Sequence, residues 1–232
     1  MEFGPLEKTL GHSFRDKNVL MEALTHRSYL NERPLWTVPH NERLEFLGDA
    51  VLELVVTEEL FNRFPDRPEG PLTSLRAALV NYVMLARVAR EAGLEDYILL
   101  SKGEARDIGR ARDVILANAI EAVIGALYLD GGYGAAKKFV NARVLTKLDE
   151  VIRQGLDKDA KSELQERAQA EWKVTPEYRI IAERGPDHQK EFTAAVFFGA
   201  ERMGEGGGAS KQDAEVEAAK NALEKIKTKI SN

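Results

Sequence analysis

Residues 41–50 read Asn-Glu-Arg-Leu-Glu-Phe-Leu-Gly-Asp-Ala and open an apolar-periodic segment that continues to about Phe64. This periodicity predicts a helix. Residues three, four and seven apart share a helix face, so Glu42, Glu45 and Asp49 lie together with no basic residue among them. Like charges at this spacing destabilise a helix. The cluster therefore indicates a bound cation, although amphipathic helices also carry acidic residues on solvated faces.

A second polar pair lies much later in the chain, inside an otherwise apolar segment. Asn118 and Glu121 are three residues apart, and the neighbours of Glu121 are alanine, valine, isoleucine and glycine. If this helix packs against the segment that begins at residue 41, one oxygen-rich pocket results. Hard divalent cations prefer oxygen ligands, and a bound Mg²⁺ can activate water and stabilise a phosphodiester displacement.

The composition is that of an ordinary globular protein of 232 residues, 44% hydrophobic and 31% charged. There is no cysteine, which excludes disulfides and zinc-thiolate sites and fits a reducing compartment. No apolar run reaches the length of a membrane span and the N-terminal residues lack a signal pattern, so we expect a cytoplasmic protein with no membrane partner. The net charge of −5 argues mildly against nucleic-acid binding, but a carboxylate-rich metal site would account for part of it.

The first part of the chain, residues 1–153, is expected to be almost entirely helical. Its periodic segments are 16–30, 41–64, 72–92, 111–130 and 134–153. Prolines and glycines mark the breaks between them, and residues 130–132, Asp-Gly-Gly, are typical of a helix end. Residues 154–160 are expected to form a short polar linker.

The second part, residues 161–232, has a mixed pattern. It predicts a helix at 161–173, strands at 178–182, 192–198 and about 200–204, and a last helix at about 210–228. This order suits an α+β domain with an antiparallel sheet. The glycine-rich run 204–209 fits a loose dinucleotide-binding pattern, but too few residues follow it for that fold. We therefore expect no nucleotide cofactor, and a tight approach of this run to the last helix.

The whole chain resembles bacterial ribonuclease III. The similar segments, in the family's order, are 23–29, 41–50, 69–70 with Leu72 and 76–77, 102–104, 121–122 and 125–130. The second part resembles the double-stranded-RNA-binding domain that follows the nuclease domain in bacterial members. The resemblance implies a mainly α endonuclease domain at 1–153 and an α-β-β-β-α RNA-binding domain at 161–232.

This resemblance implies a homodimer that cuts both strands of duplex RNA with Mg²⁺, for which Mn²⁺ can substitute. The products would carry 5′-phosphates, 3′-hydroxyls and short 3′ overhangs, and the targets would be ribosomal and messenger RNA precursors. Glu45, Asp49 and Glu121 match the catalytic and metal-binding carboxylates, and Glu42 matches a further acidic position near the cleavage site. Phe46 matches the aromatic residue that inserts into the partner subunit; ordinary core packing is the alternative.

Asn118 stands where the family usually has aspartate. Its amide oxygen can still face a metal ion, but it carries no charge and accepts no proton. Three interpretations remain open: a natural variant that tolerates asparagine, which we favour; a form inactivated to trap bound RNA; or a protein that binds duplex RNA without cutting it. A further alternative is an acidic helical interaction module whose carboxylates lie on its surface.

The second part carries matches to the family's RNA-binding positions. Gln165 and Glu166 match residues placed in one minor groove of the RNA, and Pro186 and His188 match the loop that enters the next minor groove. Lys211, at the start of the last helix, matches the phosphate-binding position. The alternatives are a turn histidine without a ligand and a solvated lysine.

The charge of this part departs from the family pattern. Gln212 replaces the second of two adjacent lysines, and residues 160–232 contain 12 Lys and Arg against 13 Asp and Glu. We therefore expect weak, salt-sensitive binding of duplex RNA by the second part alone.

Overall fold

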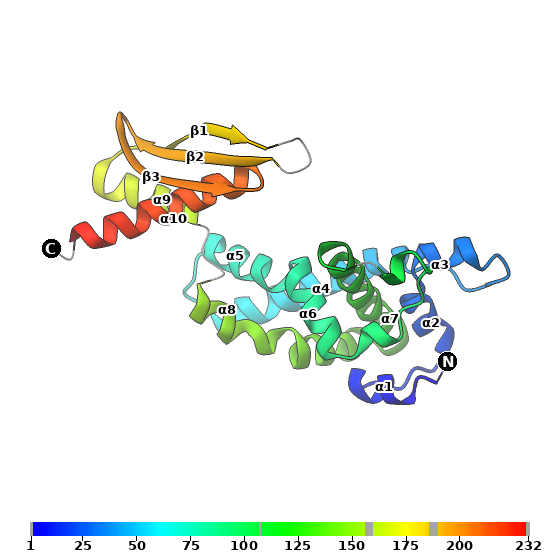
Figure 1. Ribbon diagram of the computed structural model, residues 1–232. Helices are drawn as coiled ribbons and strands as arrows, with labels where there is room; N and C mark the ends of the chain where they lie inside the picture. Colours follow the sequence, from blue (N-terminus) through cyan, green and yellow to red (C-terminus); the bar gives the residue numbers. More distant parts are fainter. Residues whose placement is uncertain (1, 107, 156–159, 186–189, 231–232) are drawn as a thin grey trace. The chain divides into compact units, whose positions relative to one another are not determined.

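The structure is a computed structural model that describes residues 2–106, 108–155, 160–185 and 190–230 (Figure 1). The chain separates into two compact units, Met1–Asp157 and Lys158–Asn232. The first unit is helical, and the second contains a three-stranded antiparallel sheet with flanking helices. The fold classes predicted for both parts are confirmed.

Eight α-helices are described in the first unit. They are α1 (Gly4–Leu10), α2 (Lys17–Leu24), α3 (Arg27–Glu32), α4 (Glu42–Arg63), α5 (Glu69–Val80), α6 (Tyr82–Glu91), α7 (Arg110–Arg143) and α8 (Leu148–Gln154). Helix α1 and three helix breaks were not expected from the sequence; one break divides the expected helix at 134–153, where α7 ends and α8 begins. Between α2 and α3 the backbone N–H of His26 donates to the carbonyl of Leu99 at 3.1 Å, which interrupts the expected helix at 16–30. Asn81 interrupts the expected helix at 72–92 because its side chain caps α6, accepting a hydrogen bond from the Met84 N–H at 3.0 Å.

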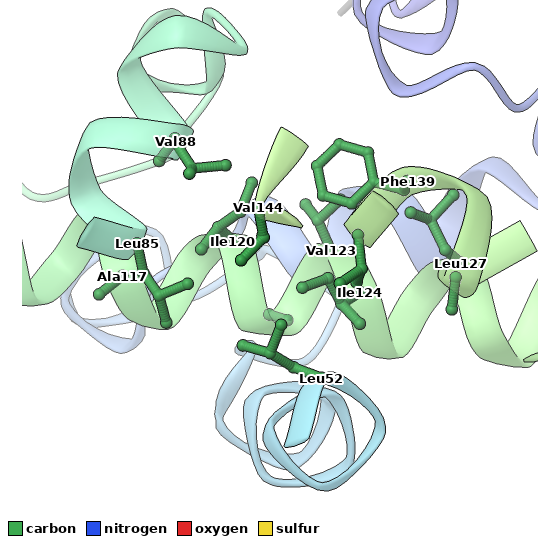
Figure 2. Packing of buried hydrophobic residues seen from close by; sticks show 14 of the residues in the cluster. Leu52, Leu85, Val88, Ala117, Ile120, Val123, Ile124, Leu127, Phe139 and Val144 are labelled. Carbon is green, nitrogen blue, oxygen red and sulfur yellow. The ribbon is translucent and has the colours of Figure 1, made fainter. Parts of the chain in front are cut away.

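Helix α7 forms the centre of the first unit. Figure 2 shows Leu52 of α4 on one side of it and Leu85 of α6 on the other, around Ile120 and Ile124. By length and composition the apolar window within 110–154 could span a membrane, but 67% of it is buried in the domain, as is usual for a core helix. Gly132, with φ of 72°, breaks the helical conformation where the sequence predicted a helix end.

Asp130 precedes this break and holds the N-terminal segment in place. His12 Nε2 lies 2.7 Å from its carboxylate, and the backbone N–H groups of Arg15 and Asp16 each donate to it at 3.1 Å. Burial alone would raise the pKa of Asp130, but these hydrogen bonds outweigh burial and lower it to about 2. The carboxylate therefore stabilises the fold while it is ionised.

The second unit is built on a sheet of order β1-β2-β3. Its elements are α9 (Ala160–Arg167), a π-helical turn (Ala168–Trp172), β1 (Glu177–Arg184), β2 (Glu191–Phe198), β3 (Glu201–Gly208) and α10 (Lys211–Ile230). β3 is longer than expected and includes most of the glycine-rich run. A Cβ on Gly204 would lie 2.4 Å from the Ala218 carbonyl oxygen, and a Cβ on Gly206 would lie 2.2 Å from the Ala218 nitrogen. The run is therefore a strand on which α10 packs directly, and its expected tight approach to that helix is confirmed.

We predict that Asp130→Asn lowers the free energy of unfolding at pH 7 by about 2–4 kcal/mol, because hydrogen bonds to a buried charged group are lost. The wild-type advantage is present above the ordinary aspartate pKa of about 4 and disappears as the pH falls towards 2. Urea unfolding at several pH values measures this, with the exposed Asp66→Asn as control. Equal unfolding midpoints for both variants at pH 7 would contradict the assignment.

Candidate functional site

The two acidic segments meet where the backbones of α4 and α7 touch. A Cβ on Gly48 would lie 1.8 Å from the carbonyl oxygen of Glu121, and a Cβ on Gly125 would lie 2.3 Å from the carbonyl oxygen of Leu44. Both positions therefore require glycine. Neither glycine was assigned a role from the sequence, although each lies inside a long helix, where glycine is unfavourable by about 1 kcal/mol. That unfavourable placement was the available signal.

This contact brings the expected metal ligands within electrostatic reach of one another. Burial and then the charges of Asp49 and Glu45 raise the pKa of Glu121 to about 8. Burial, Glu42 and Asp49 likewise raise the pKa of Glu45, and the side-chain amide of Asn118 acts to lower it. Residues far apart in sequence thus share one electrostatic environment, as the two helix patterns predicted.

The donor chemistry of this cluster suits a hard divalent cation. Glu45, Asp49, Asn118 and Glu121 offer only oxygens as metal ligands, and every nearby charge that acts on Glu121 is negative. Within the described residues, no group of three or more acidic or histidine side chains already has the geometry of a metal site. The helix contact therefore fixes the backbone positions, and the flexible carboxylates would have to converge to bind an ion.

Glu42 lies at the edge of the cluster, at the first residue of α4. The guanidinium of Arg27 donates to its carboxylate at 3.2 Å, and His40 Nδ1 lies 3.8 Å from it. Glu42 still acts on Glu45 as a repulsive charge. It is thus an exposed and paired acidic residue beside the candidate site.

Phe46 points out of the first unit. Its side chain is 81% exposed, which rules out core packing within the chain. Leu54 and Phe61 of the same helix are also exposed, and their spacing places all three on one side of α4. A cavity of about 490 Å³ adjoins this side. Its apolar lining residues are Leu60, Phe61, Phe64, Pro65 and Leu72, and its polar lining residues are Thr57, Arg67, Glu69, Thr73 and Arg76.

The described RNA-binding candidates of the second unit are all accessible. Gln165 and Glu166 are exposed on α9, and Lys211 is the first residue of α10. Pro186 and His188 lie outside the described residues. The Nζ of Lys211 is 3.4 Å from the carboxylate of Glu183, a contact that the sequence analysis did not anticipate.

Comparisons with known proteins identify both units. A ribonuclease-III-like family profile matches residues 16–148, and a profile of the double-stranded RNA binding motif matches residues 160–226. The chain belongs to the ribonuclease III family. Ribonuclease 3 of Symbiobacterium thermophilum is 48% identical over 217 residues, which cover 93% of this chain and 91% of the relative. Ribonuclease 3 of Enterococcus faecalis is 46% identical over 221 residues, which cover 95% of this chain and 96% of that relative.

A solved structure supports the nuclease fold. It is the nuclease domain of ribonuclease III from Campylobacter jejuni, which is 43% identical to this chain and is described as flexible in a region involved in dimer formation. The match covers 62% of this chain and 97% of that domain, with a TM-score of 0.56. This chain is therefore an endoribonuclease that acts on double-stranded RNA, and it belongs to a family that depends on divalent metal ions. The alternatives of a non-cleaving RNA-binding protein and an acidic interaction module are not favoured.

We predict that Gly48→Ala destabilises the first unit by about 3 kcal/mol, because its new Cβ forces α4 away from α7. Duplex-RNA cleavage should fall with it. Gly70→Ala in α5 is the control, since a Cβ there meets nothing within 4 Å. Thermal unfolding of both variants checks this; an unchanged melting temperature for Gly48→Ala would show that the backbones are not in contact.

The raised pKa of Glu121 predicts a pH-dependent stability in metal-free protein. Between pH 4.5 and about 8 the folded chain holds the Glu121 proton more tightly than the unfolded chain, so stability falls as the pH rises through this window. Glu121→Gln should remove this loss and gain about 1–3 kcal/mol at pH 8, after allowance for partial solvent exposure. Chemical unfolding in chelator at pH 5 and pH 8 measures it, with Glu59→Gln in α4 as control. A Glu121→Gln variant less stable than wild type at pH 8 would contradict the electrostatic account.

Proposed function

We propose that this ribonuclease works as a homodimer with Mg²⁺, for which Mn²⁺ can substitute, and leaves 5′-phosphates, 3′-hydroxyls and short 3′ overhangs. The observation that carries the proposal is the backbone contact of Gly48 with Glu121, which unites the acidic faces of α4 and α7. The proposed targets are ribosomal and messenger RNA precursors, as in the family that the chain resembles.

The metal ligands in this proposal are Glu45, Asp49, Asn118 and Glu121. When bound, a divalent ion supplies an activated water and stabilises charge on the phosphodiester oxygens. The chain's own contribution is a set of negative charges that repel one another, as the raised pKa of Glu121 indicates. Glu42, held by Arg27 at the edge, is proposed to contact the RNA near the cleavage site.

The exposed side of α4 is proposed as the dimer interface. A two-fold axis makes an interface self-complementary, so a residue that protrudes from one subunit needs a recess on the same face of the other. Phe46 protrudes, and the apolar cavity beside Phe61 is a recess near the opposite end of the same helix. Two antiparallel copies of α4 would place each Phe46 against the partner's cavity.

The RNA-binding positions complete the proposal. Gln165 and Glu166 are exposed on α9, where they are available for 2′-hydroxyls and base edges in a minor groove. Lys211 is proposed to contact phosphate at the start of α10, where helix dipole and side-chain charge both favour an anion. Pro186 and His188 keep their proposed role in the next minor groove.

Asn118→Asp tests the metal site. We predict that this chain cuts duplex RNA with Mg²⁺, and that Asn118→Asp needs about ten-fold less metal, because a fourth carboxylate attracts the cation. The same charge should lower the melting temperature in chelator. Cleavage of a long RNA duplex over a range of Mg²⁺ and Mn²⁺ is the assay. If only Asn118→Asp cuts, this chain is a binding form; if neither cuts while both bind RNA, the ligand assignment is wrong.

Phe46→Glu tests the dimer. We predict that the dimer dissociation constant rises by at least about 100-fold, since the apolar contact of the Phe46 ring is lost and a carboxylate would have to give up its hydration in the recess. Sedimentation velocity over a concentration series measures it. Leu35→Glu is the matched control because Leu35 is 94% exposed and lies outside α4. An unchanged dissociation constant for Phe46→Glu would place the interface elsewhere.

A further inference from the structure

One carboxylate of the second unit lies between two lysines that come from different elements. Glu183, near the end of β1, has its carboxylate 3.4 Å from the Nζ of Lys190 and 3.4 Å from the Nζ of Lys211. Lys190 precedes β2, and Lys211 begins α10. Glu183 thus joins the end of the β1–β2 strand pair, where Arg184 pairs with Glu191, to the start of the last helix.

Phe192 lies beside this arrangement. Glu183 is the cross-strand partner of Phe192, and the Nζ of Lys211 lies 5.7 Å from the centre of the Phe192 ring. The hydrogen bond with Lys211 is the largest cause that lowers the pKa of Glu183, so the carboxylate is ionised at neutral pH. Lys211 therefore has an anionic partner within its own domain.

A carboxylate in this position resembles a phosphate in its chemistry. Both are anions whose oxygens accept hydrogen bonds from ammonium groups. The start of α10 already carries Asp213 in its first turn, which is bonded to the capping Ser210. The region around Lys211 therefore carries two carboxylates, those of Glu183 and Asp213.

We propose that Glu183 is an internal competitor of the RNA phosphate for Lys211, and that it limits the affinity of this domain for duplex RNA. The inference rests on the proposed phosphate contact of Lys211. The net charge of residues 160–232 already predicts weak binding of duplex RNA. The Glu183–Lys211 contact gives this prediction a specific structural cause. Binding exchanges the Glu183–Lys211 pair for a phosphate–Lys211 pair and leaves Glu183 near a like charge.

The competing possibility is that Glu183 helps binding by holding both lysines in place. Exposed ion pairs of this kind order their side chains only weakly. The side chain of Lys211 is 61% exposed, so water can replace Glu183 as its partner. Repulsion between Glu183 and an arriving phosphate is therefore the larger effect, and removal of the carboxylate should tighten binding.

The test measures duplex-RNA affinity of the full chain without divalent metal, so that no cleavage occurs. The probe is a fluorescein-labelled RNA duplex of about 20 base pairs, followed by anisotropy from about 50 to 300 mM KCl. The variants are Glu183→Gln, Lys211→Gln and the double variant. Glu177→Gln is the matched control: it removes the carboxylate of another exposed ion pair on β1, with Arg179 at 2.9 Å, about 20 Å away and beyond the screening length.

We expect Glu183→Gln to bind duplex RNA about three- to ten-fold more tightly than wild type at low salt. The slope of log K against log salt concentration should become steeper by up to about one. The gain should vanish in the Lys211→Gln background, and Glu177→Gln should match wild type. Unchanged or weaker binding of Glu183→Gln, when Lys211→Gln binds more weakly than wild type, would overturn the competition. If Lys211→Gln binds as wild type does, the proposed phosphate contact itself fails.

Discussion

The backbone contact between α4 and α7 is the constraint on which the rest of the first unit depends. With glycine at positions 48 and 125, two helices approach without an intervening side chain, because any Cβ there would overlap a backbone carbonyl. Close packing of this kind is sensitive to a single added carbon. It sets the position of α7 in the core and places Glu121 against the turn of α4 that carries Asp49.

The electrostatics of the site follow from this packing. The pKa of Glu121 is raised to about 8 because burial and two neighbouring carboxylates both disfavour its ionised form. Folding thus brings mutually repelling carboxylates together, and a bound divalent cation would reduce their repulsion. Asp130 shows the opposite case in the same helix, since donors surround its carboxylate and stabilise the ionised form.

Much of this fold could be predicted from the sequence because its signals are local. Helix periodicity, glycine breaks and alternating strands identified the main elements and both fold classes. The break at Asn81 was missed because a cap depends on one side-chain hydrogen bond within a pattern that stays apolar. The glycine contact and the Glu183–Lys211 pair were missed because both join residues far apart in sequence. The site residues stood out because their carboxylates interrupt apolar helices.

We expect the α4 and α7 carboxylates to bind one cation together. Calorimetric titration of Mn²⁺ into wild type, Glu45→Gln, Glu121→Gln and the double variant tests this. If both residues hold the same ion, each single change weakens binding strongly and the double change adds little, so the effects are not additive. If the losses of Mn²⁺ binding free energy are fully additive, or if either single variant keeps one Mn²⁺ site unchanged, the two helices bind ions independently and there is no shared site.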